Sequence, residues 1–165
     1  MIARLIALLR RMFARGEPTF SEAGPRDAAA IAALHAASFH RGWSDGDLES
    51  MLLDPAVLAH RAMLGRSLVG FILSRVVTDE AEILSVAVSM SRRSKGLARK
   101  LLDLHLRRLA GLGARAVFLE VDQDNVPALR LYKRAGFREV GRRDAYYRDA
   151  AGKTTAALVL RRDLV

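Results

Sequence analysis

Clusters of apolar residues predict a series of strands in the first half of the chain. Residues 57–63, 67–77 and 80–88 are rich in branched apolar side chains, and only two polar residues separate the last two segments. Connections this short favour antiparallel neighbours. With a shorter strand predicted at residues 18–22, we expect this half to form an antiparallel meander.

Helix signals interrupt the first part of this meander. Pro25 begins an alanine-rich helix that runs to about Ala37. Ser44, with Asp47 three residues later, has the spacing of a capping box at a second helix start, and Pro55 closes that helix.

The apolar period becomes helical from Gly96 onward. Between Ala98 and Leu109 the apolar residues gather on one side of a 3.6-residue helix, and the charged residues fall on the other. His105 lies on the apolar side, where we expect a buried, satisfied histidine. Gly111 and the glycine two residues later end this helix, which should therefore pack on the core.

Three further strands and one helix complete the chain. Strands are predicted at residues 116–121, 137–143 and 154–161, and a helix begins after Asn125 and ends at Gly136. A run of strands followed by strand, helix, strand, helix, strand and strand indicates a mixed α/β (α+β) fold. The sheet should be largely antiparallel with a parallel pair at its centre, flanked by about four helices.

Length and composition favour one globular domain. The chain has 165 residues, 51% of them hydrophobic, and contains no cysteine. We expect one domain over residues 17–165 behind a basic, amphipathic extension over residues 1–16. No stretch of about 20 apolar residues occurs in that extension, so it should not span a membrane. Packing on its own domain, fraying and weak association of residues 1–15 with a membrane surface all remain open for it. A cytoplasmic location fits the absence of cysteine and of a secretion signal.

Charge and residue types exclude several kinds of site. Without cysteine there can be no disulfide, thiolate metal site or cysteine nucleophile, and the four histidines lack metal-ligand spacing. The net charge of +9 would favour phosphate-bearing ligands or a ribonucleoprotein neighbourhood. Because the arginines are dispersed and no aromatic residues are interleaved with them, a solvated basic surface fits better than a specific nucleic-acid site.

A basic, glycine-containing loop stands directly before the long helix, in the sequence RRSKGLARKLL from Arg92. The free N–H groups of a helix N-terminus carry partial positive charge, and glycine lets an anion approach the backbone. The loop is compatible with a solvated helix cap and with a cradle for a pyrophosphate. It lacks the glycine spacing of the Walker loop and of the dinucleotide fingerprint.

Two longer stretches, LSVAVSMSRRSKGLARKLL and FLEVDQDNVPALRLYKRAGFREVGRRDAYY, resemble the GNAT superfamily of acyl-CoA-dependent N-acetyltransferases. The resemblance runs from about Pro18 to Asp163. It implies acetyl-CoA as co-substrate, a splayed central parallel pair, and pyrophosphate binding by the motif that Arg93, Gly96 and Ala98 match.

Within these stretches FLEV, NVPALRLYKRAGFREVGRR and the YY pair, with SFHRGWS upstream, resemble more specifically the bacterial ribosomal-protein-alanine acetyltransferases, the RimI-like group. Two positions depart from that group's commoner loop: Ser94 replaces a third basic residue, and Ala98 replaces the second glycine. Both remain compatible with phosphate binding.

The resemblance assigns roles in direct transfer of an acetyl group within a ternary complex. Glu120, otherwise a charge on a solvated sheet face, would be the general base acting through a water molecule. Tyr132, otherwise a core aromatic residue, would be the general acid. Asn125 could cap its helix, bind the pantetheine arm of the cofactor, or do both. The arm itself would lie along the backbone of residues 86–88 like an added strand.

These considerations give a complete candidate site. The cofactor-binding residues are Val86, Ala87, Val88, Arg93, Ser94, Lys95, Gly96, Leu97, Ala98, Arg99, Asn125 and Tyr132. The acceptor-binding residues are Trp43, Glu120, Tyr146 and Tyr147. Trp43 could equally be a core or cleft-wall residue, and the two tyrosines could simply pack the last hairpin.

The resemblance implies acetylation of a protein N-terminus, specifically the N-terminal alanine of a small-subunit ribosomal protein. An α-amino group, with a pKa of about 7.7 to 8.0, is easier for one carboxylate to deprotonate than lysine at about 10.4. A lysine side chain or a small-molecule amine remains an alternative acceptor. A module that binds RNA or a membrane without catalysis is a further alternative, which strongly salt-dependent RNA affinity would favour.

Overall fold

The computed structural model describes residues 16–39 and 41–165. The predicted basic, amphipathic extension over residues 1–16 falls almost entirely outside these residues. The strands are β1 (Thr19–Glu22), β2 (Val57–Leu64), β3 (Ser67–Val77), β4 (Glu80–Val88), β5 (Ala116–Asp122), β6 (Arg138–Arg148) and β7 (Thr154–Asp163). The α-helices are α2 (Ala28–Ser38), α3 (Asp45–Leu53), α4 (Leu97–Gly111) and α5 (Val126–Arg134), with 3₁₀ turns at Pro25–Asp27 and Met90–Arg92. None of the helices in these ranges is long and apolar enough to cross a membrane.

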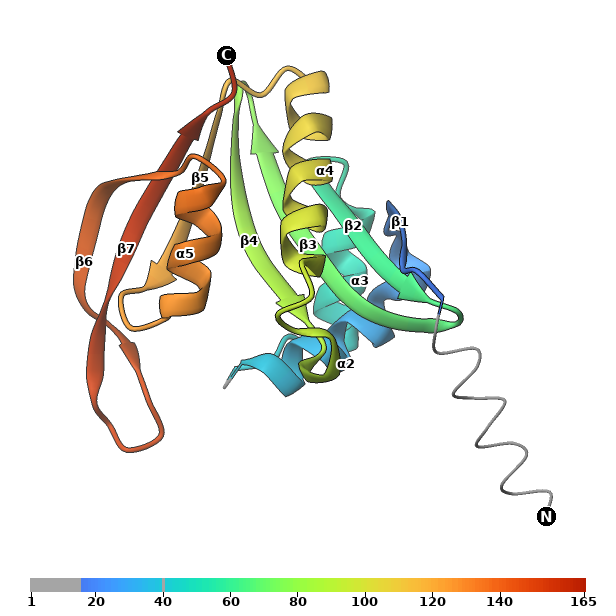
Figure 1. The fold of residues 1–165 in the computed structure, drawn as a ribbon, viewed down its shortest axis with the longest axis horizontal. Coiled ribbons are helices and arrows are strands. Elements are labelled where there is room, and N and C mark those ends of the chain that lie inside the picture. The colour runs from blue at the N-terminus through green and yellow to red at the C-terminus, as the bar shows by residue number, and fades with distance from the viewer. Residues whose placement is uncertain (1–15, 40) are drawn as a thin grey trace.

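All seven strands form one sheet in the order β1-β2-β3-β4-β5-β7-β6. Neighbouring strands run antiparallel except β4 and β5, which are parallel. This parallel pairing joins only Glu80–Ile83 to Ala116–Leu119, after which the two strands diverge (Figure 1). The predicted mixed sheet with a splayed parallel pair is therefore confirmed.

A β-bulge lies where the two central strands begin to separate. Leu73 pairs with Ser85 and Ser74 pairs with Ile83, so Leu84 is an extra residue in β4. A bulge bends its strand and increases the local twist. The bend carries the end of β4 away from β5, and the backbone of β4 after Ile83 has no β5 partner.

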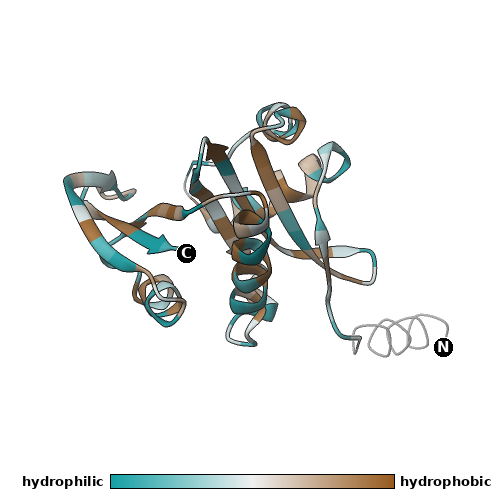
Figure 2. Ribbon diagram, turned by 90° about the horizontal axis from the view of Figure 1, so that it is seen from above, coloured by the Kyte–Doolittle hydropathy of each residue, from teal (hydrophilic) through white to brown (hydrophobic). Residues whose placement is uncertain are grey.

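The helices cover the sheet from both sides. Helices α4 and α5 share one hydrophobic core with the sheet, and α2 and α3 share another on the opposite face (Figure 1). Seen from above, β6, β7 and α5 form a wing beside the layers built on β2, β3 and β4 (Figure 2). Helix α4 buries the apolar side predicted from its sequence, through Leu97, Leu101, Leu102, His105, Leu106 and Leu109.

His105 is buried and hydrogen-bonded, as expected. Its Nδ1 lies 2.8 Å from Nδ1 of His60, and its Nε2 lies 2.7 Å from Oγ of Ser74. Burial, and secondarily the charge of His60, lowers the pKa of His105 to about 3. Burial also lowers the pKa of His60. Both rings are therefore neutral near pH 7, and they join α4 to strands β2 and β3.

The capping box predicted at Ser44 is also present. The Ser44 hydroxyl accepts a hydrogen bond from the N–H of Asp47 at 3.1 Å, and the Ser44 N–H donates to the Asp47 carboxylate at 3.0 Å. The two residues hold the start of α3.

The predicted end of the sixth strand, at residue 143, is wrong. Strand β6 continues to Arg148, because its pairing with β7 resumes at Tyr147 and Thr155 after an irregular stretch that contains Ala145 at a φ of 52°. The sequence signal breaks there because extra residues enter β6 without partners on β7. The extension brings Tyr146 and Tyr147 into the sheet.

Candidate active site

Most of the predicted site residues lie on the elements that meet at the diverging end of β4 and β5. Strand β4 leads through a short loop into α4, and β5 leads through a short loop into α5. Both helices therefore begin at the carboxyl ends of the parallel strands, where ligands bind in open α/β sheets. Their N-termini place partial positive charge on both sides of the opening.

The start of α4 is shaped to accept an anion. Gly96, its N-cap residue, has a φ of 78°, and a Cβ atom added there would meet nothing within 4 Å. The N–H groups of Leu97, Ala98 and Arg99 make no hydrogen bond to any residue in the described part of the chain. First-turn amides that are open to an approaching group form an anion site when basic side chains surround them.

Two of the basic side chains around this helix end have partners within the protein. Arg93 donates through Nε to the carbonyl oxygen of Val88 at 3.2 Å, which ties the loop to the end of β4. Arg99 is paired with Asp103 one turn later, at 3.0 Å. Ser94 and Lys95 are exposed, and Ser94 adopts a left-handed φ of 59° that turns the loop into the helix.

The backbone of β4 offers a free edge beside the start of α4. Val86, Ala87 and Val88 pair with β3 on one side, and β5 has left them on the other. An extended ligand could add to such an edge through main-chain hydrogen bonds.

Asn125 caps α5 in the way its position predicted. Its side-chain oxygen accepts a hydrogen bond from the N–H of Ala128 at 3.2 Å. The capping role is confirmed, and its role toward a cofactor stays a prediction.

Tyr132 projects from α5 into the core beside the opening. It is buried, and its ring packs edge-on against Phe137 with centroids 5.6 Å apart. Burial, and secondarily the charge of Tyr147, raises the pKa of Tyr132 to about 12. Within the described ranges no hydrogen bond to its hydroxyl is present. The phenol therefore keeps its proton at neutral pH, and its role as a proton donor stays a prediction.

Glu120 and Tyr147 lie close together on the far side of the sheet from α5. Phe118, Glu120 and Asp122 are the partly exposed residues of β5, and they alternate with buried ones as the sequence predicted. Burial, followed by the charge of Glu120, raises the pKa of Tyr147 to about 12. Tyr147 in turn contributes to the raised pKa of Tyr132, so the charges of Glu120 and Tyr147 act on the tyrosines at this end of the sheet.

Sequence reasoning missed the ion-pair partner of Glu120, which is Arg143. Its Nη1 lies 3.2 Å from Oε1 of Glu120, and its guanidinium carbon lies 5.4 Å from the centroid of the Tyr146 ring. The rings of Tyr146 and Tyr147 meet edge to face at 5.2 Å. No sequence signal could identify Arg143, because it is one of several arginines in β6 and its partner lies two strands away.

Trp43 belongs to a different group of side chains. Its ring stacks on His35 at 4.3 Å, and Phe39 packs on the same histidine at 4.6 Å. Burial lowers the pKa of His35, whose Nδ1 has no hydrogen-bond partner in the described structure. Trp43 thus packs against the core of α2 and α3, which agrees with the prediction of a core or cleft-wall residue. In the described part of the chain, no ring contact joins Trp43 to the tyrosines of β6.

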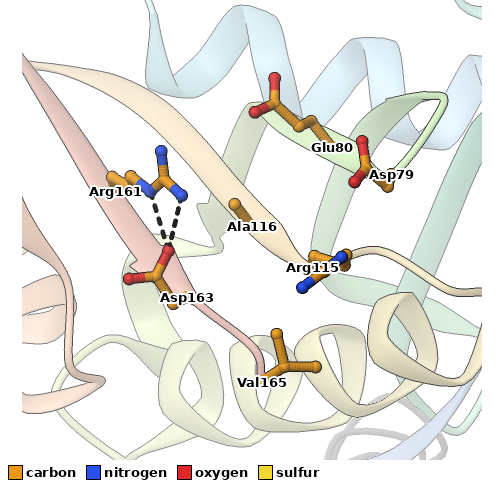
Figure 3. A pocket seen from close by; sticks show the side chains of 7 residues that line it. All are labelled: Asp79, Glu80, Arg115, Ala116, Arg161, Asp163 and Val165. Atoms are coloured by element: carbon orange, nitrogen blue, oxygen red, sulfur yellow. Dashed lines mark hydrogen bonds and ion pairs between the residues drawn. The ribbon is translucent and has the colours of Figure 1, made fainter.

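A pocket of about 340 Å³ lies away from all these residues (Figure 3). It is at the closed end of the parallel pair, where β5 begins and β7 ends, and an ion pair of Arg161 with Asp163 forms part of its wall. None of the predicted site residues lines it. Across residues 16–39 and 41–165, no group of three or more side chains suited to a metal ion is found.

Comparison with known proteins identifies the family. The model of the acetyltransferase (GNAT) family matches residues 26–137. The crystal structure of the ribosomal-protein-S18-alanine N-acetyltransferase from Escherichia coli superposes with a TM-score of 0.84, at 26% identity, covering 90% of this chain and 94% of that one.

Similar sequences carry two kinds of name. The mycothiol acetyltransferase of Mycobacteroides abscessus is 33% identical over 75% of this chain and 46% of its own length. The bS18-alanine N-acetyltransferase of Escherichia coli K12 is 34% identical over 54% of this chain and 60% of its own length. The matched region thus spans about half of these curated relatives. With a family model covering most of the chain and a fold in agreement, the chain belongs to the GNAT family of acetyltransferases.

Proposed function

We propose that the protein transfers an acetyl group from acetyl-CoA to the α-amino group of a protein N-terminus, specifically the N-terminal alanine of a small-subunit ribosomal protein. The observation that carries the proposal is the free N-terminus of α4 beside the unpaired edge of β4, at the end of the sheet where β5 carries Glu120 and α5 carries Tyr132. The similarity to enzymes named for the alanine of bS18 supplies the acceptor.

The start of α4 fits the phosphates of acetyl-CoA. Gly96 leaves room for a phosphate against the backbone, and the amides of Leu97, Ala98 and Arg99 are available to donate to it. Arg93 and Lys95 add positive charge, and the free edge of residues 86–88 would take the extended pantetheine arm. When bound, acetyl-CoA supplies an activated acetyl thioester.

Two side chains of this protein would handle the protons. Glu120, 21% exposed, can accept through a water molecule the proton that the acceptor nitrogen loses as it forms the amide. Tyr132 holds its proton at Oη and can donate it to the leaving group, because its pKa of about 12 keeps the phenol neutral. Transfer between two bound substrates needs no nucleophile on the protein, which agrees with a chain that contains no cysteine.

A small-molecule amine is the second candidate acceptor. The observation that favours it is the similarity to mycothiol acetyltransferases, at 33% and 37% identity over 138 and 110 residues.

Mass spectrometry of two peptides tests the proposal. The purified protein is incubated with acetyl-CoA and a peptide that has a free N-terminal alanine and no lysine, or a peptide that is blocked at its N-terminus and has one internal lysine. Acetylation of the first alone is expected. Acetylation of the second alone would assign the enzyme to lysine side chains. Acetylation of neither, in a protein that still binds acetyl-CoA, would favour a small-molecule amine.

A further inference from the structure

The acceptor side of the site holds two carboxylates and one arginine on a single face of the sheet. Glu120 and Asp122 come from β5, and Arg143 reaches toward them from β6 across the intervening strand β7. Asp122 and Arg143 both pair with Ala157 of β7, whose side chain is only a methyl group, while Glu120 pairs with Val159.

The two carboxylates have different partners. Asp122 accepts hydrogen bonds at both oxygens, from the hydroxyl of Thr155 at 2.8 Å and from the N–H of Asp124 at 2.9 Å. Although Arg143 is in register with Asp122, its ion pair is with Glu120, at 3.2 Å. The Tyr146 ring supports the other side of the guanidinium at 5.4 Å.

We propose that Arg143 is a specificity-determining residue that keeps ammonium groups away from Glu120 and so selects α-amines over lysine side chains. This inference rests on the proposed function and deepens it. The arginine neutralises the carboxylate that would otherwise attract any cation entering the site. An acceptor therefore gains little by arriving as an ammonium, and its neutral form is the one that competes for the position beside Glu120.

The selectivity follows from the different pKa values of the two kinds of amine. At pH 7.5 about a quarter of α-amino groups with a pKa near 8 are neutral, against about 0.1% of lysine side chains with a pKa near 10.4. Without Arg143, the unpaired carboxylate of Glu120 would attract lysine ammonium groups and deprotonate some of them. The side chains of this pair are partly exposed, 58% for Arg143 and 21% for Glu120. Because solvent screens their charges, we expect Arg143 to change the selectivity between the two amines by roughly fivefold.

Three variants separate charge from packing. Arg143→Gln removes the charge, Arg143→Lys keeps it, and Arg142→Gln removes the neighbouring arginine, which pairs with Asp144 at 2.7 Å instead of with Glu120. For each protein, kcat/KM is measured at pH 7.5 for the alanine peptide and for the N-terminally blocked lysine peptide. Thermal melting checks that every variant is folded.

Only the Arg143→Gln variant should change selectivity. The ratio of lysine to alanine kcat/KM should rise about fivefold in it and stay within twofold of the wild type in the other two. An unchanged ratio in Arg143→Gln, or an equal rise in Arg142→Gln, overturns the role of Arg143 while leaving N-terminal acetylation intact. If the wild-type protein prefers the lysine peptide, that result refutes the proposed function. Comparing the lysine-to-alanine ratio of kcat/KM between wild type and Arg143→Gln still tests the role of Arg143. If it acetylates neither peptide, calorimetric binding of both peptides to the CoA-saturated protein replaces kcat/KM, and equal affinity ratios in wild type and Arg143→Gln reject the inference.

Discussion

Replacing Gly96 by leucine should remove acetyl-CoA binding without unfolding the protein. The residue has a φ of 78°, and the space beside it is open, so the new side chain would meet no neighbouring atom at its Cβ. The cost to the fold is therefore the left-handed backbone alone, about 1 to 2 kcal/mol. In a protein of this size that lowers Tm by roughly 2 to 8 °C.

The cost to binding is expected to be larger. A side chain at Gly96 would fill the space through which a phosphate reaches the first-turn amides of α4. Each hydrogen bond from an amide to a charged phosphate contributes about 1.5 to 3 kcal/mol, so losing one or two raises the Kd for acetyl-CoA by at least about 10-fold.

Gly113 provides a matched control at the other end of the same helix. Its φ is 94°, and an added Cβ would also meet nothing within 4 Å. Gly113→Leu should cost similar stability and leave the Kd for acetyl-CoA, measured by isothermal titration calorimetry, unchanged. Equal Kd values for wild type and Gly96→Leu, or equal losses of affinity in both variants, would refute the assignment of the α4 N-terminus as the phosphate site.

Three further changes test other parts of the structure. Tyr132→Phe keeps the buried ring and removes the proton donor, so kcat should fall about 100-fold while the Kd for acetyl-CoA stays the same; an unchanged kcat would exclude Tyr132 as the acid. Because the pKa of His105 is lowered to about 3, the unfolded chain binds more protons below pH 6.5, and the free energy of unfolding should fall by roughly 2 kcal/mol between pH 7 and pH 5. Urea unfolding of His105→Gln at both pH values should show a clearly smaller fall, and an identical fall would contradict this origin. Ser44→Ala removes the hydroxyl that accepts from Asp47 and should lower the free energy of unfolding by about 1 kcal/mol, with no change in acetyl-CoA affinity; a loss of affinity instead would mean that the start of α3 takes part in cofactor binding.

Local patterns were enough to place most secondary structure. The predicted bounds of β3 and β4 match the structure, and the helix starts at Ser44, Gly96 and Asn125 are those observed. These features depend on neighbours in the sequence, since a cap, a glycine or an apolar period acts over a few residues. Strand β6 was predicted too short because a bulge interrupts its pattern, and pairing with β7 carries it on to Arg148.

The candidate site also combines features that are local in the sequence with features that depend on the fold. The loop and first turn of α4 could be read as an anion site from one continuous segment, whereas the roles of Glu120 and Tyr132 came only from resemblance to a family. Their positions around one opening depend on where β5 and α5 lie in the fold.

The sequence by itself determined the helices and strands, their order along the chain, the parallel pair and the family. Each of these depends on short-range periodicity, on the succession of elements or on contiguous motifs. Only the tertiary structure decided which distant side chains meet. His105 joins His60 across 45 positions and Ser74 across 31, and Arg143 reaches Glu120 over an intervening strand. Such pairs depend on strand order, register and the local bulges. Those follow from the packing of the whole chain, since a shift of one residue in its strand would turn His60, Ser74, Glu120 or Arg143 to the opposite face of the sheet.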